Sequence, residues 1–134
     1  MVKQEDIVSN ALIMKNLYFS EIKFNATGKR ASSNGFANIS FDEKHSIKEN
    51  VIDIQLFSKV EVEEVFELEL CLNGTFEAGN IKSESMLPNA IAIMFPYLRT
   101  QVSLMTAQPN IPTVSLKPIN INALLEKQQE DKEN

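Results

Sequence analysis

The middle of the chain alternates apolar and polar residues with a period of two. The apolar positions are Ile52, Ile54, Leu56, Val60 and Val62 in residues 51–62, and Phe66, Leu68, Leu70 and Leu72 in residues 66–73. Such alternation predicts two β-strands, each with one buried face and one polar face. The acidic link Glu63-Glu64 between them is expected to be the tip of an antiparallel hairpin.

Two earlier segments show weaker alternation. Ile22 and Phe24 alternate with polar neighbours in residues 21–25, and Ile39 and Phe41 do so in residues 36–41. The stretch 27–35 between them is rich in turn-forming residues and is expected to be a loop. Four strands in succession predict an antiparallel sheet whose polar face meets water.

The apolar period changes from two to that of a helix near Asn89. One stripe consists of Ile91, Phe95, Leu98, Val102 and Met105, and a second stripe, on the opposite side, consists of Ile93, Tyr97 and Leu104. A helix that is apolar on two sides has to be covered twice. We expect the sheet to cover the first stripe and another subunit to cover the second. Pro96 lacks a backbone N–H, so a kink or a late helix start is expected there.

After the long helix, residues 108–118 contain Pro109, Pro112 and Pro118, a density that excludes regular helix and favours an extended crossover. A short final helix is expected over residues 120–129, with Asn120 as its N-cap. The fold class predicted is therefore α+β: a four-stranded antiparallel sheet with a long helix, an extended proline-rich crossover and a short C-terminal helix. Residues 1–134 form one domain in this interpretation, with flexible ends at 1–10 and 130–134.

Composition narrows the classes of function. The 134 residues carry a formal net charge of −5, and the basic residues are scattered, which argues against a nucleic-acid partner. Cys71 is the only cysteine, so no disulfide can form within one chain. The first residues lack the basic start and long apolar stretch of a signal peptide, and no apolar run is long enough to span a membrane. A cytoplasmic location is expected, without membrane insertion.

No group of residues suggests catalysis. His45 is expected in a polar loop and Asp42-Glu43 in a solvated turn, without a positioned partner for acid–base chemistry. Cys71 lies beside acidic residues, which disfavour a reactive thiolate. The four glycines are isolated and form no phosphate-binding loop. We therefore expect no enzyme activity, no cofactor and no metal site. The eight phenylalanines and five methionines suit a promiscuous apolar binding surface, although they also suit a core.

Three segments carry a resemblance to a known family. Residues 88–99 contain Pro88-Asn89, a short apolar stretch and Phe95-Pro96-Tyr97 followed by Arg99. Residues 112–125 combine a strand-like apolar run, Pro118-Ile119-Asn120 and an apolar helix start, and residues 17–24 look like a first strand. This combination resembles the SecB protein-export chaperones. The resemblance is specific over residues 88–125.

The resemblance implies a homotetramer, built as a dimer of dimers, that holds unfolded preproteins in apolar grooves and passes them to the SecA motor. The family's SecA-docking acids fall on Glu21 and Glu69, whereas a further family acid falls on Asn25, a loss for which Glu67 is the candidate substitute. The substrate groove is expected to include Leu124 and Leu125, and also Ile111, Val114, Phe36 and Phe41. The oligomer interface is expected at Ile93, Tyr97 and Leu104.

Three interpretations of function follow from the sequence. The first is an ATP-independent chaperone for protein export. The second is a SecB-like chaperone dedicated to one client, such as the antitoxin of a toxin–antitoxin pair, which the missing acid at Asn25 favours slightly. The third is an oligomeric structural module without a client. Binding of unfolded chains separates the third interpretation from the first two.

Overall fold

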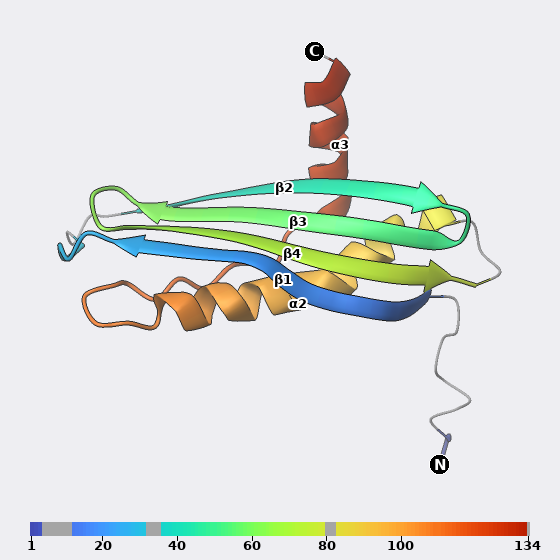
Figure 1. The fold of residues 1–134 in the computed structure, drawn as a ribbon, viewed down its shortest axis with the longest axis horizontal. Helices are drawn as coiled ribbons and strands as arrows, with labels where there is room; N and C mark the ends of the chain where they lie inside the picture. The colour runs from blue at the N-terminus through green and yellow to red at the C-terminus, as the bar shows by residue number, and fades with distance from the viewer. Residues whose placement is uncertain (4–11, 32–35, 80–82, 134) are drawn as a thin grey trace.

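The alternating segments pair into one four-stranded antiparallel sheet, which is followed by helices, as the sequence predicted. The computed structural model describes residues 1–3, 12–31, 36–79 and 83–133. Its elements are β1 (Leu12–Ala26), β2 (Ala37–Lys48), β3 (Val51–Val62), β4 (Phe66–Ala78), the short 3-10 helix η1 (Ser83–Met86), α2 (Leu87–Thr106) and α3 (Ile121–Glu133). Helix α2 lies along one face of the sheet, and α3 projects past the β2 edge (Figure 1).

The strands follow the order β1-β4-β3-β2. Strands β2, β3 and β4 are joined by two hairpins, with Lys48 opposite Val51 and Val62 opposite Phe66. Strand β1 pairs with β4, so the connection from β1 to β2 crosses from one edge of the sheet to the other. This is a Greek-key arrangement. Two irregularities in β1, between Met14 and Asn16 and between Phe19 and Glu21, shift its register against β4.

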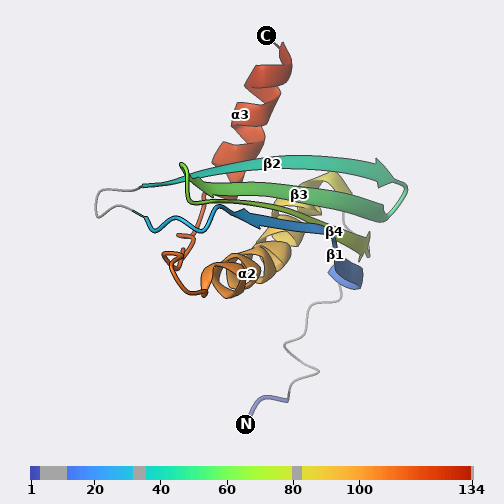
Figure 2. The ribbon, with the colours of Figure 1, turned by 60° about the vertical axis from the view of Figure 1, so that its left-hand side comes forward.

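The core lies between the sheet and α2. The apolar face of β3 and β4 includes the fully buried Ile52, Leu68 and Phe76. Helix α2 packs its own buried residues against this face (Figure 2). The packing is tight at Gly74, where a Cβ atom would lie 2.8 Å from Sδ of Met94. The sheet and helix are therefore in contact at a position where only glycine fits without movement of a neighbour.

Helix α2 begins earlier than the sequence suggested. It starts at Leu87, with Pro88 in the first turn, where a missing N–H leaves no helical hydrogen bond unmade. The helix continues through Pro96 to Thr106, so the alternative of a late start at Pro96 is wrong. The hydroxyl of Thr100 donates a hydrogen bond of 3.0 Å to the Pro96 carbonyl. The first predicted stripe faces the core: Ile91, Phe95, Leu98 and Val102 are buried.

The crossover contains neither helix nor strand from Pro112 to Asn120 and is tied to α2 by side chains. The hydroxyl of Ser103 donates to the Val114 carbonyl at 3.1 Å, and Nε of Arg99 donates to the Leu116 carbonyl at 3.0 Å. Asn120 caps α3 as predicted, because its Oδ1 accepts the Ala123 N–H at 3.0 Å. Helix α3 then runs to Glu133, so residues 130–133, which were expected to form a flexible end, are part of a helix. Residues 4–10 and 134 lie outside the described part.

Candidate functional site

The second stripe of α2 is an apolar surface that nothing in the described part of this chain covers. Ile93 is 40% exposed, Tyr97 50% and Leu104 63%. These positions lie on the side of the helix that faces away from the sheet, opposite the buried stripe. Large apolar side chains this exposed, on one face of a helix, are typical of a surface that binds another polypeptide.

A hollow beside this stripe is lined by residues of both α2 and the crossover. It has a volume of about 560 Å³. Its lining combines apolar, polar and charged side chains: Pro96, Leu104, Ala107 and Leu116, then Thr100, Ser103, Thr113 and Ser115, and Arg99. Leu104 belongs both to the exposed stripe and to the hollow. The two features therefore form one continuous surface of mixed but largely apolar character.

The side chains predicted to line a groove do not all have the same environment. Phe41, Ile111 and Leu125 are partly buried against the core, and the rings of Phe41 and Phe95 meet edge to face with centroids 5.8 Å apart. Leu124 is half-buried and Phe36 is 82% exposed. Helix α3 packs mainly on β2 and α2, which brings Leu124 and Leu125 to the β2 side of the fold.

Val114 differs from the other groove candidates. It is only 7% exposed, its N–H donates to the Thr106 hydroxyl at 2.9 Å, and its carbonyl accepts from Ser103. The side chain belongs to the hydrophobic core. Its assignment to an accessible groove is therefore corrected: this residue anchors the crossover, because both its side chain and its backbone groups are already in use.

The three predicted docking acids lie on one face of the sheet, as expected from the alternation of side chains along each strand. Glu67 and Glu69 alternate along the outer face of β4, and Glu21 pairs with Cys71, so that it lies diagonally beside Glu69. Asn25 faces Glu67 at the position where the resemblance places a further acid. All three glutamates therefore occupy neighbouring positions on the face away from α2.

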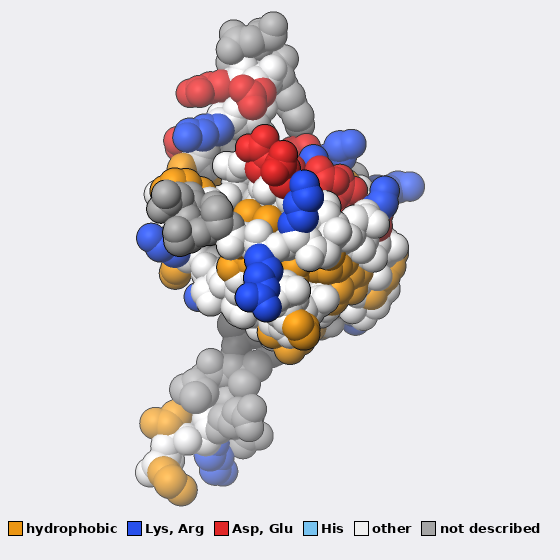
Figure 3. Space-filling model, turned by 90° about the vertical axis from the view of Figure 1, so that its left-hand side faces the viewer, with side chains coloured by type: hydrophobic (Ala, Val, Ile, Leu, Met, Phe, Trp, Pro, Cys, Tyr) orange, Lys and Arg blue, Asp and Glu red, His pale blue; other side chains and the backbone are white. Residues whose placement is uncertain are grey.

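Lysines reduce the negative charge of this outer face. Lys59 lies between two acids, with Nζ 3.7 Å from Oε1 of Glu67 and 3.9 Å from Oε2 of Glu61, and Lys23 pairs with Glu69 across the β1–β4 ladder. Viewed from the end that carries the β3–β4 turn, acidic side chains gather on one part of the surface with basic ones among them (Figure 3). The surface is acidic, but it is not a single uninterrupted patch.

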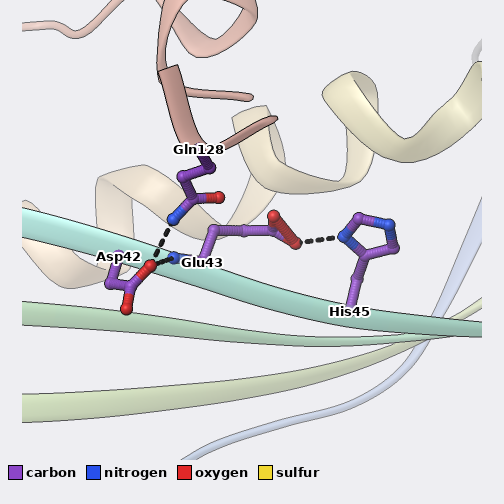
Figure 4. Close-up of polar contacts among 4 residues, drawn as sticks. All are labelled: Asp42, Glu43, His45 and Gln128. Atoms are coloured by element: carbon purple, nitrogen blue, oxygen red, sulfur yellow. Dashed lines mark hydrogen bonds and ion pairs between the residues drawn. The ribbon is translucent and has the colours of Figure 1, made fainter. Parts of the chain in front are cut away.

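Strand β2 contains a buried acid that the sequence pattern did not reveal. Asp42, Glu43 and His45 lie in β2, not in a turn and a loop as expected. Glu43 is 3% exposed, and its Oε1 lies 2.5 Å from Nδ1 of His45 (Figure 4). Asp42 Oδ1 accepts both the Glu43 N–H and a hydrogen bond from Gln128 of α3. The sequence did carry one indication of this burial. In a strand, Glu43 and His45 lie on the same side as Phe41, which faces inward.

Cys71 is the only cysteine of the chain. Cys71 is buried on the outer face, where Asn73 contacts its sulfur at 3.7 Å. Among the residues that the structure describes, no group of three histidine, cysteine or acidic side chains is arranged to hold a metal ion. Over the same residues, no helix is long and apolar enough to cross a membrane.

Comparison with known proteins gives a consistent result. The family model described as "Preprotein translocase subunit SecB" matches residues 10–132. The protein-export protein SecB of Methylobacillus flagellatus is 28% identical over 102 residues, which are 71% of this chain and 63% of that protein. The protein-export protein SecB of Buchnera aphidicola is 35% identical over 89 residues, which are 58% of this chain and 61% of that protein. The chain thus spans less than two thirds of either relative.

A solved structure shares the fold. The SecB-like chaperone Rv1957 of Mycobacterium tuberculosis, determined in complex with a peptide from the antitoxin HigA1, superimposes with a TM-score of 0.64. The match covers 82% of this chain and 88% of that one, at 8% sequence identity. The four-stranded antiparallel sheet with one long and one short helix is therefore a known arrangement. With the family match over residues 10–132, these findings lead to one conclusion: this chain belongs to the SecB family.

Proposed function

We propose that the protein is an ATP-independent chaperone that binds unfolded polypeptides and keeps them competent for export. The observation that carries this proposal is the apolar surface that stays free of the proposed subunit interface, formed by Phe36, which is 82% exposed, and by the half-buried Leu124 at the start of α3. Contact with apolar surface is non-directional, at roughly 25 cal/mol per Å² buried, so such a surface accepts many sequences. Membership of the SecB family and the names of the curated relatives support the same function.

The test uses refolding of a urea-denatured preprotein without nucleotide. We expect the wild type to slow refolding, and the pair Phe36→Ser and Leu124→Ser to weaken this effect, since these side chains are accessible and removing them leaves the core intact. Ile13→Ser is the matched control, because Ile13 is 45% exposed on the opposite face of the sheet. A wild type that delays no denatured client contradicts the chaperone function. An unchanged effect in the pair contradicts the groove assignment alone.

The chaperone is proposed to work in the cytoplasm as a homotetramer, a dimer of dimers. Ile93, Tyr97 and Leu104 are the proposed interface, since their exposure on one helix face is costly in an isolated chain. Tyr97→Asp should split the assembly, because an unpaired charge buried at an interface costs several kcal/mol. Sedimentation of the wild type and of the variant measures this. A wild type that is monomeric at micromolar concentration contradicts the proposed interface.

Transfer of the client to SecA is proposed to use the outer face around Glu21, Glu67 and Glu69. Their neighbouring positions support this, whereas Asn25 and the Lys59 ion pair with Glu67 weaken the negative charge. Exposed charges are screened over about 8–10 Å, so binding to SecA should weaken as salt rises. Glu69→Lys should weaken it further. If the affinity for SecA changes neither with salt concentration nor with this charge reversal, the outer face has no role in the binding.

A second candidate is a SecB-like chaperone dedicated to one client, such as an antitoxin. Two observations favour it: the partly neutralised outer face, and a fold neighbour solved with an antitoxin peptide. The two functions differ in breadth of binding. A set of unrelated denatured proteins should all be retained by an export chaperone, whereas a dedicated chaperone should retain one client only. Retention of none favours an oligomeric structural module instead.

A further inference from the structure

One edge of the sheet is open along β2. The strand order β1-β4-β3-β2 places β2 at the end of the sheet, and in the described part of the chain no strand pairs with its other side. The strand is 12 residues long. A long free edge presents unpaired backbone N–H and C=O groups, which are a template for pairing with another chain. The residues of β2 that bear on this edge are therefore of interest.

The backbone at Glu43 shows which groups face the free edge. The Glu43 N–H donates to Oδ1 of Asp42 at 2.9 Å instead of entering the ladder to β3, so it points to the open side. Because the two sides alternate along an antiparallel strand, the backbone groups of Phe41 and His45 face the same edge. Gln128 of α3 donates to the same carboxylate oxygen, which holds it there (Figure 4). The carboxylate thus occupies a donor that an added strand would need.

Glu43 itself is a charged side chain on the buried face of an edge strand. It is 3% exposed, and its partner in the described structure is His45. Burying a carboxylate is costly even when it is paired, so its presence in β2 calls for a physical reason. Inward-pointing charges on edge strands are one means by which natural sheets prevent edge-to-edge pairing.

The sequence of β2 is self-complementary apart from its central acids. Two copies can meet in antiparallel fashion at a two-fold axis on Glu43. Ile39 then lies opposite Ile47 on the buried side, and Asp42 lies opposite Lys44 on the outer side, which are favourable pairs. The two Glu43 side chains, however, lie directly opposite each other on the buried side, where like charges repel. Moving the axis by one residue places two copies of Asp42 opposite each other instead.

We propose that Asp42 and Glu43 prevent the free edge of β2 from pairing with the same edge of a second copy of this protein. Asp42 occupies an edge N–H, and Glu43 places like charges opposite each other on the buried side. Each subunit of an oligomer carries one such edge, so pairing would join oligomers into larger aggregates. Helix α3 extends past the same edge (Figure 1), but it is synthesised well after β2, so these two side chains protect the strand before the helix is in place.

The chain offers matched variants for the test. Glu43→Gln removes the charge and keeps the shape of the side chain and its hydrogen bond with His45. Asp42→Ala removes the group that occupies the edge N–H. Glu61→Gln is the control, because it makes the same chemical change on β3, which is paired on both sides. Ile39→Pro, added to the double variant Asp42→Ala with Glu43→Gln, blocks an added strand at a position whose N–H faces the free edge.

Sedimentation after refolding from urea, over a range of protein concentrations, measures the association. Removing the opposed buried charges should strengthen it on the order of a hundredfold. Removing the Asp42 carboxylate should strengthen it by roughly fivefold to tenfold. The double variant should therefore form species larger than the wild-type assembly, the Glu61→Gln control should not, and Ile39→Pro should abolish them. In the larger species the amides of Phe41 and His45 should exchange more slowly than in the wild type.

Three results overturn the proposal. In the first, the double variant has the circular dichroism of the wild type and sediments like it at every concentration. In the second, larger species form but the Phe41 and His45 amides exchange at the wild-type rate, so another surface is in use. In the third, these amides are protected only when a denatured preprotein is added, so the edge accepts a client and not a second copy. If the double variant does not fold, Glu43→Gln alone decides, because a neutral amide is less costly to bury than a carboxylate.

Discussion

Replacing Gly74 by alanine tests how closely α2 packs on the sheet. A Cβ atom at this position would lie 2.8 Å from Sδ and 3.0 Å from Cε of Met94, and 3.0 Å from Cε2 of Phe76. Met94 and Phe76 are both 0% exposed, so neither has free space on its other side. Forcing an extra carbon into a packed core costs typically about 1–3 kcal/mol. Alanine also lowers the conformational entropy of the unfolded chain relative to glycine, which offsets about 0.4–1 kcal/mol of this cost. We expect a net loss of about 1 kcal/mol.

The cause can be assigned by changing Met94 as well. Met94→Ala alone leaves a cavity and should destabilise by about 2–5 kcal/mol. In that background the two contacts with Met94 are removed and only the 3.0 Å contact with Cε2 of Phe76 remains, so Gly74→Ala should cost less than in the wild type and come close to neutral. The interaction energy between the two sites is then on the order of 1–2 kcal/mol, within the range for residues in contact.

Urea unfolding followed by circular dichroism measures the four proteins of this cycle. All four are compared at one protein concentration, because association of subunits adds to apparent stability by mass action. If Gly74→Ala destabilises the wild type and the Met94→Ala variant equally, the contact between the sheet and α2 is not the source of the loss. The packing argument is then refuted.

Three further substitutions test other local features. Ser58→Ala should raise the free energy of unfolding by about 1 kcal/mol, because the Ser58 hydroxyl is buried without a partner in the described structure; a loss in urea unfolding contradicts this. Glu49→Gly should stabilise the β2–β3 hairpin by about 0.5–1 kcal/mol, since Glu49 has a φ of 58°; no rise in melting temperature counts against it. Asn120→Ala should destabilise α3 by about 1 kcal/mol through loss of its cap, visible as faster exchange confined to that helix.

Of the two strands that alternate cleanly, β3 was predicted to the residue, whereas β4 was predicted over residues 66–73 and runs from Phe66 to Ala78. The run Val51–Val62 is a strand with the expected bounds, because one side of it is buried all along its length. The second half of β2 was missed for the opposite reason. Glu43 and His45 take inward positions there, so the apolar signal stops although the strand continues to Lys48. A buried polar pair conceals a strand from any prediction based on alternation.

Neither the order of the strands nor the set of residues that line the groove could be predicted from the local pattern of apolar and polar residues. Alternation identifies the face that each strand buries, but it carries no information about which edges pair, so the β1–β4 ladder could not be derived. The alternation of the two faces along each strand did predict correctly that Glu21, Glu67 and Glu69 lie on one face. The crossover has no periodicity, which explains why the buried Val114 and the more accessible Ile111 looked equivalent in sequence.

The edge-to-edge path from β1 to β2 has a consequence for how the chain is made. During synthesis β1 leaves the ribosome first, but its partner is β4, and Leu12 pairs with Ala78. The β2–β3–β4 meander can close from short hairpins, whereas β1 waits for a contact distant in sequence, which is the slow class of folding event. A nascent apolar strand therefore stays unpaired until most of the sheet has been translated. Each newly made copy passes through the same unfolded, strand-exposing state that the finished protein is proposed to recognise in others.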